Sequence, residues 1–423
     1  MKALMQKHAA KKTTNLPAHQ DKDLVALALK EVEARWSQMT HEQYEDVETL
    51  IGLPHPYIVP TTQAREGFVF HELYYWDTYF VIEDFVDRGR VDMAKGMVED
   101  FLAMVERFGV IPNSSRYYML SRSQIPFLTS MILKVYEKTQ DKDWLRKAML
   151  LAEREYRNVW ISEMHPHNRR VFNGLSRYYE INMLDDLAEA ESGWDYTTRF
   201  DDRCLDFIPI DLNANLYKYE QDFATMADIF KDEELALAWR ERAEARKASV
   251  DEYLWNEKAG MYFDYDYTNG KQGKVCSLAV YMPMFLGMAS KAQAEKLVKN
   301  LDRFLTEHGL STTALDEPIA ARHQWANPNG WAPLQFIVVR GLERYGYHDL
   351  AKDIALRWVS TNLRVFNYTG ELFEKYNVIN PLEEPVEGVY PSQVGFGWTN
   401  AVLENFIHDY CLEDSDIEKR YKQ

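Results

Sequence analysis

Apolar residues recur at spacings of three and four along most of this chain, and this periodicity constrains the fold more than any other feature. Over residues 91–109, Val98, Phe101, Val105 and Phe108 fall on one face of a helix. The same pattern recurs over three further stretches, residues 140–160, 224–255 and 348–366. Strand signals are few, and only residues 261–273 suggest a short hairpin. We therefore expect an all-α protein.

The segments between the periodic stretches indicate how the helices are organised. They are rich in Pro and Gly, and no Ser/Gly-rich linker or low-complexity run divides the chain. A length of 423 residues allows two or three domains but also one large barrel. We predict a helical arm over residues 1–45 and a single domain over residues 46–423.

Two architectures suit such a run of helices, a solenoid of helix pairs and a closed barrel. A helical solenoid should repeat itself with a period of about 34–47 residues, and no such repeat is present. Instead, the segments between the helices differ from one another and carry Trp, Asn, Arg and acidic residues. Loops of this kind suit an (α/α)₆ barrel of about twelve helices, in which they converge on one pocket.

Charge and composition narrow the function. The net charge of −17 argues against nucleic acid and against anionic membrane surfaces, because both need clustered Lys and Arg. The three cysteines are far apart, and none of the eleven histidines forms a metal-binding pair. No apolar stretch is long enough to span a membrane, and the N-terminal residues lack the apolar region of a signal peptide. We expect a soluble, cytoplasmic protein without metal or other cofactor.

Six segments concentrate residues that can bind and cleave a sugar, because rings stack on its C–H faces while carboxylates and amides fix its hydroxyls. They are residues 67–80 around Asp77, 109–127 with Asn113, Arg116, Arg122 and Gln124, 191–200 with Asp195, 323–335, 371–378 with Glu374, and 388–400. Ordinary packing of a helix start is the alternative explanation for the first segment, and a solvated surface loop is the alternative for the second.

These segments resemble the trehalases of glycoside hydrolase family 37. The matching motifs are ELYYWDTYF, IPN with SRSQ, SGWD, QW with GWAP, and EKY with GFGWTN, in this order from about residue 57 to about residue 407. The resemblance implies an (α/α)₆ barrel that hydrolyses an α-glucoside with inversion, without metal or other cofactor. Its expected partner is a small sugar.

The resemblance also implies residue roles. Asp195 matches the family's general acid and Glu374 its general base. The positions that match sugar contacts are Phe70, Trp76, Asp77, Asn113, Arg122, Ser123, Gln124 and Gly193. The positions that match the aromatic wall of the pocket are Trp325, Trp331, Phe396 and Trp398.

The chain departs from the family at groups outside the catalytic pair. Val69 and Val389 stand where the family has an arginine and a lid glutamate, Ala326 replaces an aspartate, and an Arg-Pro-Glu triplet is missing. Arg116, Arg177 and Glu387 are the expected local substitutes. Trehalose is the leading substrate. The alternatives are a related α-glucoside, such as glucosylglycerate, glucosylglycerol or kojibiose, and a non-catalytic helical scaffold that binds carbohydrate.

Overall fold

Six helices form a closed inner ring in the computed structural model, which describes residues 17–61, 70–388 and 390–412. Each member contacts the next, and the last returns to the first. In ring order they are α3 (Tyr75–Asp87), α5 (Leu128–Thr139), α8 (Ile210–Ile229), α10 (Met282–Phe285), α12 (Ala332–Arg344) and α14 (Gly397–Tyr410).

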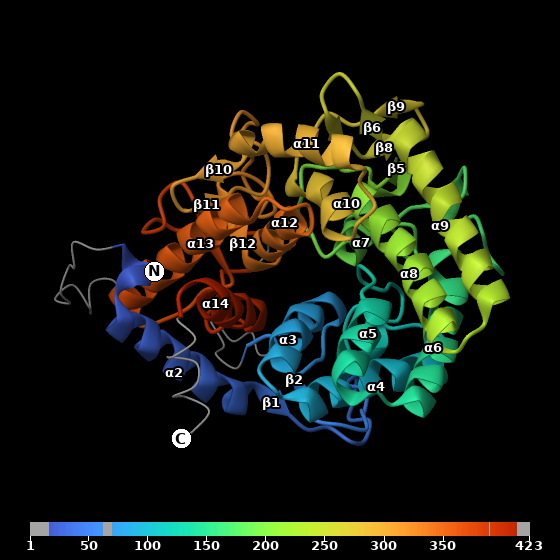
Figure 1. Ribbon diagram of the computed structural model, residues 1–423, viewed down its shortest axis with the longest axis horizontal. Coiled ribbons are helices and arrows are strands. Elements are labelled where there is room, and N and C mark those ends of the chain that lie inside the picture. Colours follow the sequence, from blue (N-terminus) through green and yellow to red (C-terminus); the bar gives the residue numbers. More distant parts are fainter. Residues whose placement is uncertain (1–16, 62–69, 389, 413–423) are drawn as a thin grey trace.

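A second set of helices surrounds this ring (Figure 1). It comprises α2 (Lys22–Met39), α4 (Val91–Phe108), α6 (Lys142–Glu155), α9 (Glu233–Tyr253), α11 (Lys291–Lys299) and α13 (His348–Thr369). One short helix, α7 (Asp185–Glu191), lies in a connection between the rings. The two concentric rings confirm the predicted all-α (α/α)₆ barrel.

Local capping explains where several outer helices begin. The carboxylates of Asp21, Asp141 and Asp232 each accept a hydrogen bond from the backbone N–H three residues ahead, which satisfies an unpaired donor of the first turn. Asp232 also corrects the sequence analysis, because the periodic stretch 224–255 is divided between α8 and α9. Lys231, with φ of 60°, lies in the break between the two helices.

Helix α2 is fastened to the barrel by buried polar contacts. The Trp36 indole donates to Glu404 on α14 at 3.0 Å, and the Arg35 guanidinium donates to Glu371. The segment assigned to an N-terminal arm, residues 1–45, thus contributes α2 to the outer ring, and residues 1–16 lie outside the described part of the chain.

The strands are two or three residues long and join the helices in small antiparallel pairs. They are β1 (Thr40–His41), β2 (Tyr57–Ile58), β3 (Arg170–Phe172), β4 (Leu175–Ser176), β5 (Phe207–Ile208), β6 (Trp255–Asn256), β7 (Met261–Tyr262), β8 (Tyr265–Asp266), β9 (Lys271–Gln272), β10 (Leu305–Thr306), β11 (Gly309–Leu310), β12 (Asn329–Trp331) and β13 (Lys375–Asn377). The pairing of β8 with β9 places a hairpin where residues 261–273 suggested one.

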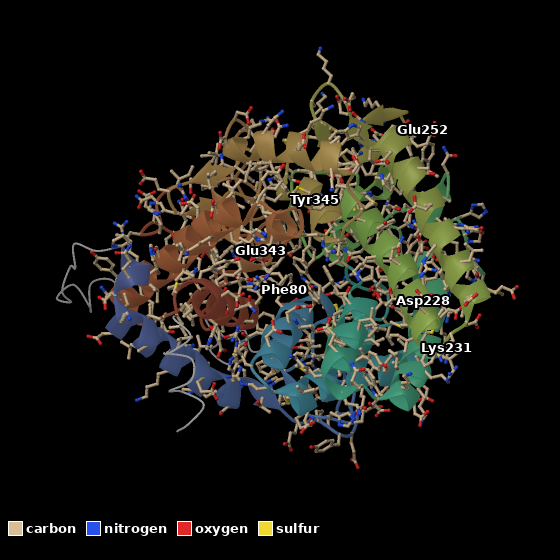
Figure 2. All side chains as sticks on the ribbon, viewed as in Figure 1. Phe80, Asp228, Lys231, Glu252, Glu343 and Tyr345 are labelled. Atoms are coloured by element: carbon tan, nitrogen blue, oxygen red, sulfur yellow. The ribbon has the colours of Figure 1, made fainter. Side chains whose placement is uncertain are left out.

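Side chains of the inner helices fill the centre of the barrel (Figure 2). Phe80 on α3 lies near the centre, where its ring is 5.8 Å from that of Phe336 on α12, and Phe336 in turn stacks against Phe406 on α14. These contacts bury apolar side chains of three inner helices against one another. Across residues 17–61, 70–388 and 390–412, every helix is too short or too polar to cross a membrane.

Candidate active site

Three carboxyl groups from distant parts of the sequence meet at one end of the barrel. Asp77 lies in the first turn of α3, Asp195 follows α7, and Glu374 immediately precedes β13. The N-terminal ends of α3, α12 and α14 meet here through the rings of Trp76, Trp331 and Trp398. A parallel bridge between Thr197 and Trp325 and the pairing of β12 with β13 bring the loops together.

Asp195 is partly buried and keeps its proton more strongly than an ordinary aspartate. Gln324 Nε2 donates to Asp195 Oδ2 at 2.7 Å. Burial, and then the neighbouring Glu374 carboxylate, raise the pKa of Asp195 to about 6, while the Lys375 ammonium opposes the shift. An aspartic acid in this range can donate a proton near neutral pH.

Glu374 is fully buried and is surrounded by donors. Its Oε2 accepts from Lys375 Nζ at 3.1 Å and from the backbone N–H of Gln393 at 3.3 Å. Its Oε1 accepts from the Tyr390 hydroxyl at 2.9 Å. Donors at both oxygens match the acceptor-only chemistry of a carboxylate, so Glu374 is placed to act as a base or a fixed negative charge.

Asp77 completes the group. Burial raises its pKa to about 8, with further contributions from Glu374 and Asp195. Carboxylates this close cannot all be ionised without a large electrostatic cost. The site therefore combines two acids with raised pKa values and one carboxylate that accepts hydrogen bonds at both oxygens.

Tryptophans pack behind the carboxyl groups. The rings of Trp325 and Trp331 stack with centroids 3.8 Å apart, and Trp194 stacks on the other side of Trp325 at 5.3 Å. Trp76 and Trp398 meet this stack edge-on or tilted. Within the described chain, the buried indole N–H of Trp194 has no hydrogen-bond partner.

The expected aromatic wall of Trp325, Trp331, Phe396 and Trp398 thus forms one cluster. Phe396 joins it through Trp398, with ring centroids 4.5 Å apart. All four side chains are at most 5% exposed, so the cluster is mainly a rigid backing for the carboxyl groups.

Gly193 allows the loop that carries Asp195 to approach this cluster. Its φ of +75° is in the left-handed region, and a Cβ built on it would lie 2.8 Å from the indole of Trp76. Both facts require glycine at this position.

Asn113, Ser123 and Gln124 lie together beneath the start of α3. Asn113 Nδ2 donates to the backbone oxygens of Ser123 and Ala190, the Ser123 hydroxyl donates to the backbone oxygen of Ile111, and Gln124 Oε1 accepts from the backbone N–H of Trp76. These observed bonds fix the positions of the loops around the site, and the Ser123 hydroxyl is used internally.

Arg122 has weak partners for a partly buried guanidinium. It donates to Ser121 Oγ at 3.4 Å and to Met119 Sδ, and no carboxylate in the described residues forms an ion pair with it. Burial lowers its pKa, and Glu180 and Glu191 oppose the shift. Nearby, the half-buried Phe70 ring lies 5.9 Å from that of Tyr74.

The expected local substitutes are engaged elsewhere or exposed. Arg116 Nε donates to Glu72 at 2.7 Å. Arg177 is nearly buried and donates to the backbone oxygens of His167, Asn168 and Leu205 and to the Tyr267 hydroxyl. Glu387 is exposed, while Val69 and Val389 lie outside the described residues. Four of the five N–H donors of Arg177 are therefore used within the protein, and its role as a substrate contact stays a prediction.

Sequence reasoning missed two residues that touch the catalytic pair, Gln324 and Tyr390, and did not determine the orientation of Lys375. Gln324 stands beside Trp325 in a segment that was singled out, and Tyr390 stands in residues 388–400. The only sequence signal was their position inside the chemistry-bearing segments, because neither residue type is specific for glycoside hydrolysis.

The (α/α)₆ barrel and its paired carboxyl groups define a glycoside hydrolase. The family model for trehalases matches residues 2–191 and 184–411, and this chain belongs to the trehalase family. In the described residues, no group of three or more His, Cys, Asp and Glu could hold a metal ion.

Solved structures agree with this assignment. The chain is 28% identical to neutral trehalase Nth1 from Saccharomyces cerevisiae, with a TM-score of 0.75 over 90% of this chain and 77% of that one. A GH63 mannosylglycerate hydrolase from Thermus thermophilus, solved with glucose, has a TM-score of 0.64 at 16% identity over 90% of this chain and all of its own. A rhamnosidase from Klebsiella oxytoca has a TM-score of 0.61 at 14% identity, over 94% of this chain and 66% of its own. The last two share the fold alone.

Proposed function

We propose that the protein hydrolyses α,α-trehalose to two glucose molecules with inversion, with Asp195 as general acid and Glu374 as general base. The observation that carries the proposal is the contrast between the two carboxyl groups. Burial and a neighbouring charge raise the pKa of Asp195 to about 6, whereas Glu374 accepts hydrogen bonds from three donors. Two carboxyl groups held in such different environments are typical of an acid–base pair.

The reaction follows from this pair. Asp195 transfers its proton to the glycosidic oxygen as the bond from that oxygen to the anomeric carbon breaks. Glu374 takes a proton from a water that attacks the same carbon from the opposite face. An inverting enzyme places the two groups about 6.5–9.5 Å apart to accommodate this water. The products are two hexoses, and the one from the cleaved side is first formed as the β-anomer.

Other residues would hold the sugar. Asp77, in the first turn of α3, can hydrogen-bond to hydroxyl groups of the sugar in either protonation state. Arg122 has more N–H donors than its weak protein partners use, and the half-buried Phe70 ring provides aromatic surface. Carbohydrate recognition combines such rings with a few placed polar groups. The proposal assigns these residues to the glucose that is cleaved.

A second candidate is a related α-glucoside, and the engagement of Arg116 and Arg177 favours it. Both are occupied by protein acceptors, so neither can easily replace the family cations that would bind a second glucose. A glucosylated acid or polyol, such as glucosylglycerate or glucosylglycerol, would need fewer such contacts.

One experiment tests both candidates. Purified protein is offered trehalose, kojibiose, glucosylglycerate and glucosylglycerol, and kcat/KM is compared under one set of conditions while proton NMR follows the first-formed anomer. The proposal expects trehalose to be preferred, and α- and β-glucose to appear in equal amounts before mutarotation, because only the attacked carbon is inverted and the leaving glucose keeps its α configuration. A glucosylated acid or polyol with a kcat/KM about a hundred times that of trehalose would replace trehalose as the proposed substrate. Initial α-glucose without an equal amount of β-glucose would reject the inverting pair.

A further inference from the structure

Gln324 lies fully buried beside the proposed acid, and its orientation follows from its contacts. Nε2 is 2.7 Å from Asp195 Oδ2 and 3.4 Å from the backbone oxygen of the same residue. A backbone oxygen can only accept, so the nitrogen side of the amide must face Asp195. Gln324 therefore donates to the acid.

The backbone and side chain of Gln324 are held from two directions. Its backbone oxygen accepts from Asn329 Nδ2 and from the Trp331 indole. Asn329 also bonds the backbone N–H and oxygen of Val386. A Cβ built on Gly388 would lie 2.7 Å from the Gln324 amide carbon. The amide is thus confined between β12 and residues 386–388.

Gln324 Oε1 is buried, and within the described chain it has no hydrogen-bond partner. Leaving a buried acceptor unpaired is costly, and purely structural amides normally use both ends. Gln335 on α12 shows the usual case, because its amide bonds both the backbone N–H and the oxygen of Leu310.

Resting on the function proposed above, we propose that Gln324 is a positioning residue for the general acid. By donating to Oδ2 it leaves the proton on Oδ1, the oxygen free to protonate the leaving group. The same bond stabilises the carboxylate that remains after proton transfer, since a donor favours the charged form.

Other charged or titratable groups also act on Asp195 and stay in place when Gln324 is changed. They are Asp77 on α3, Glu189 on α7, Glu374 and Lys375 at β13, and Tyr390. Their contributions are common to the wild-type protein and the variants. A difference in the pH profile between the wild-type protein and a Gln324 variant therefore reports the loss of the Gln324 hydrogen bond.

The test is the pH dependence of kcat for Gln324→Met, which keeps the length of the side chain but removes the donor. Loss of the bond disfavours ionised Asp195, so the alkaline limb of the profile should move up by about one to two pH units, the size of a hydrogen bond to a charged group. The kcat on the plateau should fall. Gln335→Met, an equally buried amide away from the carboxyl groups, should lower stability and leave the limb in place.

Gln324→Glu provides a second variant of nearly unchanged shape. It replaces the donor by a carboxyl group that must share a proton with Asp195, so the limb should again move up. An alkaline limb at the wild-type pH in both variants would overturn the inference. If instead Asp195→Asn kept its activity and its alkaline limb, the proposed acid itself would be wrong, whatever the Gln324 variants do.

Discussion

Replacing Gly193 by alanine tests whether the close approach between the acid loop and Trp76 is needed. The new Cβ would lie 2.8 Å from one indole carbon and 2.9 Å from the indole nitrogen, well inside normal contact distance. The backbone at this position, with φ of +75°, is also unfavourable for any residue with a Cβ.

Two effects contribute to the expected loss of stability in Gly193→Ala. The left-handed backbone costs about 1–2 kcal/mol for an alanine, and overpacking a buried site costs about 1–3 kcal/mol. The free energy of unfolding should thus fall by about 2–5 kcal/mol by these two rules. Relief of the clash must move Trp76 or the loop that carries Asp195, and a shift of about 1 Å at a reacting group can lower kcat about 100-fold.

A matched control isolates the contact. Gly174 has nearly the same backbone, with φ of +78°, but a Cβ there would meet nothing within 4 Å. Gly174→Ala should cost only the backbone part, about 1–2 kcal/mol, and keep the wild-type kcat. Urea denaturation and initial rates on the preferred substrate measure both quantities. Equal stability losses in the two variants, with wild-type kcat in Gly193→Ala, would refute the reasoning.

Three further predictions concern the carboxyl groups. Asp195→Asn and Glu374→Gln should each lower kcat by about 10²–10⁴-fold or more with unchanged circular dichroism, whereas Glu371→Gln should remain active; an essential Glu371 with a dispensable Glu374 would contradict the assignment. Tyr390→Phe removes one donor to Glu374 and should lower kcat/KM by about 10–100-fold; a wild-type value would show that the 2.9 Å bond is not used in catalysis. The Tm of Asp77→Asn should rise relative to that of the wild type as the pH increases from about 4, where the carboxyl of unfolded Asp77 ionises, to about 8, where the native carboxyl ionises. The reason is that the native state destabilises the ionised form of Asp77. A constant difference in Tm across this pH range would contradict the raised pKa.

Several features of this protein were predictable from local sequence. The three- and four-residue spacing over 91–109 and 348–366 predicted α4 and α13, because one apolar stripe on a helix needs only neighbouring turns to be recognised. Ordered motifs across most of the chain identified the family and singled out Asp195 and Glu374. The break between α8 and α9 was missed, although Asp232 is a good N-cap residue, because the apolar period continues through it.

The tertiary structure alone decided what surrounds the carboxyl groups. Gln324 and Asp195 are 129 residues apart, and neither residue's sequence neighbours indicate that they meet. Arg177 was a plausible substrate contact in sequence, and only the fold shows its donors bound to backbone oxygens. Local periodicity fixes helices because hydrogen bonds and side-chain contacts along a helix link residues three or four apart. The electrostatics of a buried site depend on which groups long-range packing brings together and how far it excludes water, and that is set by closure of the whole barrel.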